Sequence, residues 1–176
     1  MVPWRLRVLP LTACLFVLGC ANESPTTPTG TGSGNAGGGT HFVRESLTGT
    51  IAATASPECS AAFRASVDAS YYQEGTGRCV EFRRRSSTAG IITARLTWQE
   101  SRLDLDLVLN DGVGMNFRQS IAANRCCEAV EFFVNAGTDF VFVVYLRGVD
   151  PQFVANGGVY TGPVSTPFAL EVERPE

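Results

Sequence analysis

A strict alternation of leucine with other residues constrains the fold of this chain more than any other feature. Leucine occupies every second position from Leu103 to Leu109, and Asp104 and Asp106 lie between the first leucines of the series. Successive side chains of a β-strand point to opposite faces, so these leucines would share one face, whereas a helix would scatter them around its circumference. The pattern therefore predicts a strand with one buried, apolar face.

Several other segments read as strands. The segment from Phe140 to Leu146 is apolar at every position, which is typical of a central strand covered on both sides. Trp98 falls on the apolar face of an expected strand at Ile91–Trp98, so we expect it in the core. The remaining strands are expected at Ser46–Ile51, Ala62–Ala69, Val80–Arg85, Ala129–Asn135 and Phe168–Glu173. Glycine-rich turns separate them, and no amphipathic helix longer than two turns is expected. Together these features favour an all-β sandwich or barrel.

The first 40 residues differ in composition from the rest. Arg5 and Arg7 precede an apolar run, Val8–Leu18, that is about half of the ~20 residues needed to span a bilayer. A cationic start, a short apolar run and small residues at a cleavage site are typical of a secretory signal peptide. Small and polar residues then dominate, which indicates a flexible tether. The sequence thus predicts a signal peptide at residues 1–19, a disordered linker at 20–40 and one folded domain at 41–176.

The end of the apolar run, Val17-Leu18-Gly19-Cys20, resembles the lipobox of bacterial lipoproteins. The resemblance implies that Cys20 becomes the first residue of the mature protein and carries the lipid. The diacylglyceryl group of that family, usually joined by a third chain, would anchor the protein stably, since one acyl chain alone binds a membrane only marginally. It also implies the bacterial cell envelope, and Ala21, where inner-membrane retention usually requires aspartate, indicates the outer membrane. The alternative is an ordinary signal peptide with Cys20 as an incidental thiol.

The charge of the mature chain excludes one class of partner. Removal of Arg5 and Arg7 with the signal leaves 12 basic residues against 17 acidic ones, a net charge of −5. An acidic balance of this kind argues against nucleic acid as a partner.

The domain contains cysteines that fit an oxidising compartment. They are Cys59, Cys79, Cys126 and Cys127, an even number that allows three pairings. A bond between the adjacent Cys126 and Cys127 would close a small strained ring, so we favour two bridges that link Cys59 and Cys79 to the adjacent pair. The alternative is a Cys59–Cys79 bridge with a vicinal one. A structural zinc site is disfavoured because the chain has no C-x-x-C pair.

Several segments between Cys79 and Glu173 follow one another in a recognisable order. They are Val80-Glu81-Phe82, Ala94–Trp98 after Gly90, Leu103–Leu109, Glu128–Val130, Ala136–Phe140 and Phe168–Val172. Together they resemble the bacterial pre-peptidase C-terminal domain over about 95 of the 176 residues. The resemblance implies a jelly-roll-like antiparallel β-sandwich of about eight strands. Family members accompany secreted proteases or serve as surface modules, and some help to bind collagen or polysaccharide.

The chain departs from that family in two respects. Val108 and Val141 stand where the family often has an aromatic residue, and the segment from Cys59 to Cys79 has no counterpart in it. No protease accompanies the domain in this chain, so the accessory role cannot be transferred directly.

Acidic and amide side chains on and after the leucine-rich strand form a weak candidate for a structural Ca²⁺ site. Asp104 and Asp106 would project from one face, roughly 7 Å apart at Cα. With Asn110 and Asp111 they could supply hard oxygen ligands. An EF-hand is excluded because Met115 occupies the twelfth position counted from Asp104. The alternative to a Ca²⁺ site is that these carboxylates accept hydrogen bonds from loop amides or arginines. No other cofactor is expected.

Two groups of residues are weak candidates for ligand binding. Arg83–Arg85 is expected to protect an edge strand from aggregation, and Arg83 and Arg85 could also contact an anionic glycan or lipopolysaccharide. Tyr71 and Tyr72 lie in a polar segment that we interpret as a loop, where they could stack on sugars.

Catalysis has little support. His41 adjoins the linker, and the chain contains no G-x-S-x-G motif and no phosphate-binding or dinucleotide-binding signature. We therefore expect a non-catalytic binding or adhesion module for an extracellular polymer, such as a polysaccharide, or for an envelope protein. The alternative is a structural subunit that packs against another envelope protein, and a hydrolase is the third hypothesis.

Overall fold

The computed structural model describes residues 41–121, 127–149 and 162–176. Within them lie eight strands and two short helices. In chain order they are β1 (Phe42–Ala52), α1 (Ala61–Ser66), α2 (Ala69–Gln73), β2 (Arg78–Arg85), β3 (Gly90–Trp98), β4 (Leu103–Asn110), β5 (Asn116–Ser120), β6 (Cys127–Val134), β7 (Asp139–Val149) and β8 (Ser165–Pro175). No helix among the described residues is both long and apolar enough to cross a membrane. The expected signal peptide, Cys20 and the linker lie outside the described residues.

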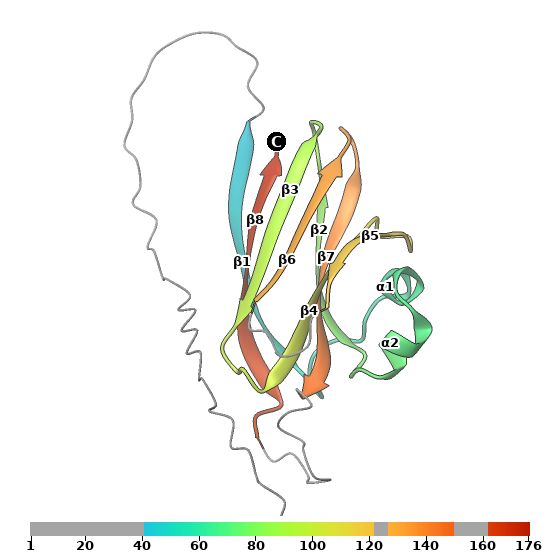
Figure 1. Ribbon diagram of the computed structural model, residues 1–176, viewed down its shortest axis with the longest axis vertical. Coiled ribbons are helices and arrows are strands. Elements are labelled where there is room, and N and C mark those ends of the chain that lie inside the picture. Colours follow the sequence, from blue (N-terminus) through green and yellow to red (C-terminus); the bar gives the residue numbers. More distant parts are fainter. Residues whose placement is uncertain (1–40, 122–126, 150–161) are drawn as a thin grey trace, which may run out of the picture. The chain divides into compact units, whose positions relative to one another are not determined.

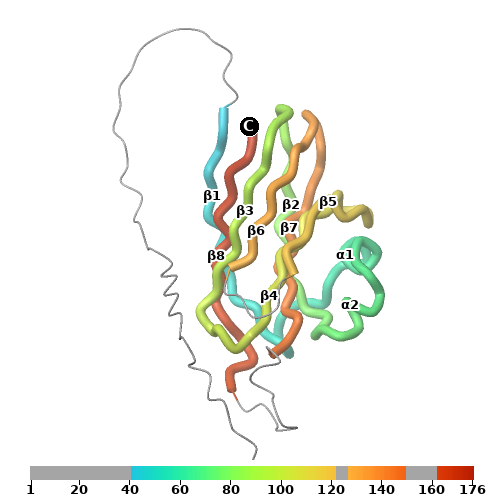
Figure 2. Tube along the Cα trace, viewed as in Figure 1, coloured from blue at the N-terminus to red at the C-terminus, as the bar shows by residue number. Residues whose placement is uncertain are grey.

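The strands form two four-stranded sheets whose neighbouring strands run antiparallel (Figures 1 and 2). Sheet A has the strand order β1-β8-β3-β6, and sheet B has the order β2-β7-β4-β5. This order, in which consecutive strands alternate between two sheets except at β4 and β5, is that of a jelly roll. The expectation of an eight-stranded all-β sandwich is therefore confirmed.

The main core lies between the two sheets and confirms the alternation of the leucine-rich strand. The leucines of β4 face this core together with residues of β7, β3 and β8. Trp98 is buried, as expected, and its indole N–H donates to the carbonyl of Leu103 over 2.9 Å. β4 is nevertheless buried at every position, because its other face is also covered.

The cover consists of α1 and α2, which lie together beside sheet B (Figure 1). Phe63 and Tyr71 from these helices pack with Val108, Val143 and Tyr145 in a second apolar cluster. This cluster explains why β7 is apolar on both faces, and the expectation of a central, doubly covered strand is confirmed.

The expected strand at Ala62–Ala69 is wrong, because most of that segment forms α1. Side-chain caps decide the local structure: Ser60 accepts a hydrogen bond from the amide of Phe63 at the start of α1, and Asp68 accepts one from Ser70 at the start of α2. β5 had no counterpart among the expected strands. It is short and alternates weakly, so periodicity gave little signal for it.

The position of the three arginines agrees with the expectation of a protected edge. β2 is an edge strand of sheet B. Arg84 points toward β1 of the other sheet, where its guanidinium donates to Glu45 over 2.9 Å, while Arg83 and Arg85 are exposed.

Truncation of the leucine stripe should cost much of the stability. Leu105 is fully buried, so Leu105→Ala is expected to lower the free energy of unfolding by about 3–5 kcal/mol, from lost transfer energy and a cavity. Val113, which is 82% exposed, provides the control, and Val113→Ala should change stability by less than about 0.5 kcal/mol. Urea unfolding measures both. Equal, small losses would contradict the two-layer packing described above.

Candidate functional site

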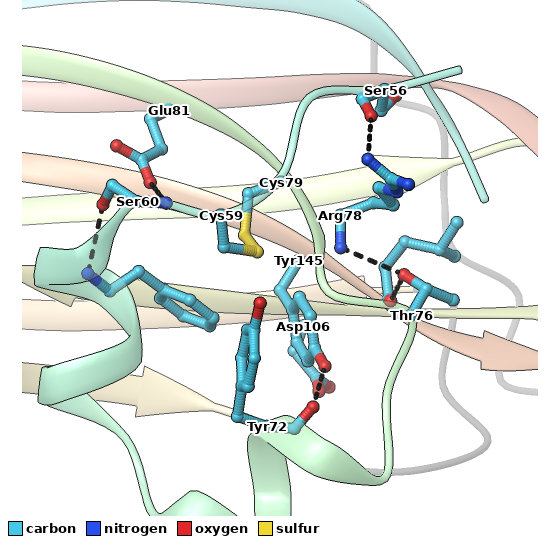
Figure 3. Close-up of a disulfide and its surroundings, with 12 residues drawn as sticks. Ser56, Cys59, Ser60, Tyr72, Thr76, Arg78, Cys79, Glu81, Asp106 and Tyr145 are labelled. Carbon is cyan, nitrogen blue, oxygen red and sulfur yellow. Dashed lines mark hydrogen bonds between the residues drawn. A yellow bond between two sulfur atoms is a disulfide. The ribbon is translucent and has the colours of Figure 1, made fainter. Parts of the chain in front are cut away.

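The outer face of sheet B, under α1 and α2, gathers several of the residues predicted to be functional. Figure 3 shows part of this region around the disulfide. Asp104 and Asp106 project from β4 on the side opposite the leucines, and both are buried. The expectation that only the leucine face of this strand is buried is therefore wrong. The alternation correctly separated them from the leucines, but it could not show that helices cover their side.

A disulfide between Cys59 and Cys79 joins the segment before α1 to the start of β2, with the two Cα atoms 4.8 Å apart (Figure 3). A bridge closing a loop of this size contributes about 3 kcal/mol. The favoured pairing of Cys59 and Cys79 with the adjacent cysteines is wrong, because Cys79 pairs with Cys59. Cys127 Sγ lies 3.6 Å from the Arg95 guanidinium, and Cys126 lies outside the described residues.

Tyr71 is held beneath the helices rather than in a polar loop. It belongs to α2 and is 8% exposed, and its phenol donates a hydrogen bond to Asp106. The Arg147 guanidinium lies 4.7 Å from the centre of the Tyr71 ring and also pairs with Glu74 over 2.7 Å. Burial raises the pKa of Tyr71, so its phenol stays protonated and keeps donating. This placement makes Tyr71 a structural residue.

Asp106 is fully buried, and only one of its two carboxylate oxygens accepts a hydrogen bond from the described residues. Burial raises the pKa of Asp106 to about 7, and the hydrogen bond from Tyr71 only partly opposes this effect. The protein therefore holds a carboxyl group that changes charge near neutral pH beneath its helices.

The four candidate calcium ligands do not form one ligand shell. Asn110 Oδ1 accepts from the amide of Gly112 over 2.8 Å, and Asp111 Oδ1 accepts from the amides of residues 113, 114 and 115. These bonds build the turn between β4 and β5. They agree with the alternative to calcium binding, in which these side chains accept hydrogen bonds from loop amides. Within the described ranges, no group of three or more His, Cys, Asp or Glu residues is placed to hold a metal.

Tyr72, in contrast to Tyr71, is partly accessible. Its ring stacks on Tyr145, whose phenol donates to the carbonyl of Tyr72 over 3.0 Å. Gly75 permits this close packing, because a Cβ there would lie 1.7 Å from the Tyr145 oxygen. Tyr72 lines a small hollow of about 260 Å³ together with Gln73 and Arg78.

The two exposed arginines form separate ion pairs. Arg83 lies 3.7 Å from Glu81, and Arg85 lies 3.2 Å from Asp139. Pairs this exposed contribute little to stability.

Two further hollows lie elsewhere, on the outer face of sheet A. One of about 410 Å³ crosses all four strands of this sheet, and a neighbouring one of about 530 Å³ crosses β1, β8 and the end of β3. None of the other described elements covers this face. Sheet A is therefore open where sheet B is closed.

Small and charged side chains are interspersed over the first hollow. Strand pairing places Arg95 between Glu171 and Ala129, and the next row places Thr93 between Glu173 and Glu131. At the β1 side, Arg44 pairs with Glu173 over 2.9 Å. The hollow is therefore lined by alanine and threonine together with side chains of both charges.

Sequence reasoning missed this face. Its residues are the outward members of four strands and read individually as ordinary solvent-facing positions. Only the register between strands shows that Ala129 lies beside Arg95 and that Thr93 lies between Glu131 and Glu173. The signal that could have found it is the occurrence of Thr93, Ala129 and Ala169 among the charged outward positions of β3, β6 and β8.

No family model matches this chain, and no curated protein matches it. Among solved structures it is similar to the crystal structure of Aeromonas hydrophila PliG, a periplasmic lysozyme inhibitor of g-type lysozyme. The identity is 9%, the TM-score is 0.36, and the match covers 78% of this chain and 90% of that one. The resemblance to the pre-peptidase C-terminal domain rests on its motifs alone, because no family model matches the chain.

The buried carboxyl of Asp106 predicts a pH dependence of stability. Between pH ~4 and ~7 the folded protein holds a proton at Asp106 that the unfolded chain has lost, so rising pH favours unfolding. At about 1.4 kcal/mol per pKa unit, this group alone removes up to about 4 kcal/mol across that window.

Asp106→Asn cannot ionise and should abolish this component. Its free energy of unfolding, relative to that of the unsubstituted protein, should therefore be higher at pH 8 than at pH 5, as measured by urea unfolding. Asp139→Asn, at an exposed position, is the control and should show little difference between the two pH values. An Asp106→Asn difference that is the same at both pH values would contradict the assignment.

Proposed function

We propose that this protein is a non-catalytic binding module, tethered to the bacterial cell envelope, whose ligand lies across the outer face of sheet A. The observation that carries the proposal is the position of two hollows, of about 410 and 530 Å³, on the one sheet that no described helix covers. Small residues such as Thr93 and Ala129 lie between the charged ones of this face and leave room for the side chains of a ligand.

The chemistry of the face favours a polypeptide as ligand. Arg44 and Arg95 lie among Glu131, Glu171 and Glu173, so cationic and anionic groups alternate over a short span. Side chains of both signs can pair with complementary charges on a protein and fix its orientation. An envelope protein or an extracellular protein polymer fits this pattern better than a neutral glycan, whose recognition relies on aromatic stacking.

The absence of catalysis is part of the proposal and rests on where the reactive groups lie. Asp106, a carboxyl group with a raised pKa, is fully buried under α2, away from the open hollows. On the open face, Glu173 is paired with Arg44 and Glu171 accepts a hydrogen bond from Ser46. Such carboxylates are engaged in holding the surface in shape.

The location in the envelope is supported by two independent features. The lipobox-like sequence at Cys20 favours lipidation and, with Ala21, delivery to the outer membrane. The Cys59–Cys79 bridge suits an oxidising compartment.

A bulky charged side chain in the hollow should weaken ligand binding. The domain is applied to an array that carries glycans, matrix proteins and envelope proteins, and binding is expected in the protein arm. Ala129→Arg, which places a long side chain on the floor of the hollow, should weaken that signal about tenfold or more. Ala61→Arg, the same change at an exposed position of α1, should leave it unchanged. A silent array, a signal in the glycan arm only, or equal binding by the two variants would count against the proposal.

The anchor is tested separately. Cells expressing the full chain should incorporate labelled palmitate into the protein, and Cys20→Ala should abolish the incorporation. The matched variant Cys14→Ala, within the expected signal peptide, should still be labelled. Equal labelling of the two variants would remove Cys20 as the lipidation site.

A further inference from the structure

β1 ends sheet A with a long and regular free edge. It pairs with β8 from Phe42 to Ala52 in an unbroken register, without a bulge. It contains neither proline nor lysine, the residues that commonly block unwanted pairing at sheet edges. Figure 2 shows it as the outermost strand of this sheet.

The hydrogen bonds at the two ends of β1 show which backbone groups face outward. The carbonyl of His41 accepts from Glu176 beyond the end of β8, whereas both backbone groups of Ala52 bond to Ser56, on the other side. Backbone groups of a strand alternate between its two sides, so the even-numbered residues of β1 face the free edge. From Arg44 to Thr50, no described residue pairs with these outward N–H and C=O groups.

The other three edges of the sandwich are protected. β2 carries the three consecutive arginines, and β5 is short and has a register shift near Asn110. The free edge of β6 is occupied by side chains of β5: Ser120 Oγ accepts from the amide of Ala129, and Arg118 donates to the carbonyl of Glu131. β1 is thus the one described edge strand whose outward groups are ready to pair.

We propose that two copies of this chain pair through β1, antiparallel, about a two-fold axis at Leu47. In this register Arg44 lies opposite Thr50 of the second copy and Ser46 lies opposite its Thr48. These residues, all outward-facing, form about eight backbone hydrogen bonds across the axis. The pairing ends at Ala52, whose backbone groups are already bonded to Ser56.

The inward-pointing charge of Glu45 selects this register. Glu45 is held by Arg84 and Arg174 at 2.9 and 3.2 Å, and it would oppose an arbitrary apolar strand. An axis at Glu45 would place two carboxylates opposite each other, and an axis at Ser46 would place each carboxylate opposite Leu47.

With the axis at Leu47, each Glu45 lies opposite Gly49 of the other copy. Gly49 has no side chain there because the Phe168 ring stands 2.8 Å from where its Cβ would be. The two Leu47 side chains, each partly buried against the core, face each other. This self-complementarity is what favours a second copy over a foreign strand.

The dimer joins the two A sheets into one continuous sheet of eight strands. It goes beyond the proposed function because it places two candidate binding faces on the same side of one surface. The two chains enter at opposite ends of the paired strands, roughly 33 Å apart for ten residues of extended chain.

Cysteine cross-linking tests the axis directly. Leu47 and its symmetry mate form a non-hydrogen-bonded pair with Cα atoms about 4.5 Å apart, within the range of a disulfide. In the chain from residue 38 onward, which contains both apolar clusters, Leu47→Cys should give a covalent dimer on a non-reducing gel that reductant reverses. Val43→Cys, also inward-facing on β1, would lie roughly 26 Å from its mate and should stay monomeric.

Sedimentation equilibrium of the same chain without substitutions provides the second readout. It should show a monomer–dimer equilibrium in which the dimer forms as the protein concentration rises. Thr48→Pro, which removes one outward N–H and leaves the β8 ladder intact, should weaken this association about tenfold or more. Thr48→Val keeps the N–H and should still dimerise. A monomer at all concentrations, or equal cross-linking of the two cysteine variants, would overturn the proposal. The array experiment with Ala129→Arg tests the proposed function alone, and its outcome does not depend on whether the chain dimerises.

Discussion

The burial of β4 and β7 on both faces is the constraint on which the rest of the structure depends. Between the sheets, the leucines of β4 pack against Phe140, Phe142 and Val144 of β7. On the other side, Val108, Val143 and Tyr145 pack against α1 and α2. Two strands covered twice bury far more apolar area per residue than two covered once. The helices are therefore part of the core of the fold, and the Cys59–Cys79 bridge fastens them at the point where the chain enters sheet B.

This arrangement gives the two sheets different roles. Covering sheet B places Asp106 in an apolar environment, where its charged form is disfavoured and the bond from Tyr71 compensates only in part. Such a group destabilises the fold at neutral pH relative to an apolar residue, but it gives α2 a specific hydrogen-bonding partner on β4. Sheet A has no comparable cover among the described residues. Charged side chains on its outer face form ion pairs with each other, as Arg44 does with Glu173. Recognition is thus expected on the sheet that the helices leave open.

The sequence predicted the sandwich well because most of its strands have clear period-two patterns. The leucines of β4 identified one core-facing side, and the apolar run of β7 identified a central strand. It failed where the decisive interactions are local or long-range. The caps Ser60 and Asp68 start α1 and α2 in a segment of weak alternation. Tyr71 therefore lies in the interior, although the sequence predicted a loop there. The bridge between Cys59 and Cys79 depends on the approach of two chain segments that no spacing reveals. The open face of sheet A depends on register, which joins residues of β3, β6 and β8 that are far apart in the chain.

The position of β1 links the free edge to the open face. In this jelly roll β8 is the one described strand that pairs with β1, so β1 is an outer strand of sheet A, and Cys20 precedes it in the sequence. Anchoring at Cys20, if it occurs as proposed, confines copies to a layer near one membrane and raises their effective concentration. About eight edge hydrogen bonds give little affinity in dilute solution, because each replaces bonds to water. Confinement lowers the entropic cost of pairing, so an edge that is only weakly self-associating in solution would be joined more completely at the membrane surface. The same pairing would present two recognition faces side by side, where a repetitive polypeptide ligand could engage both.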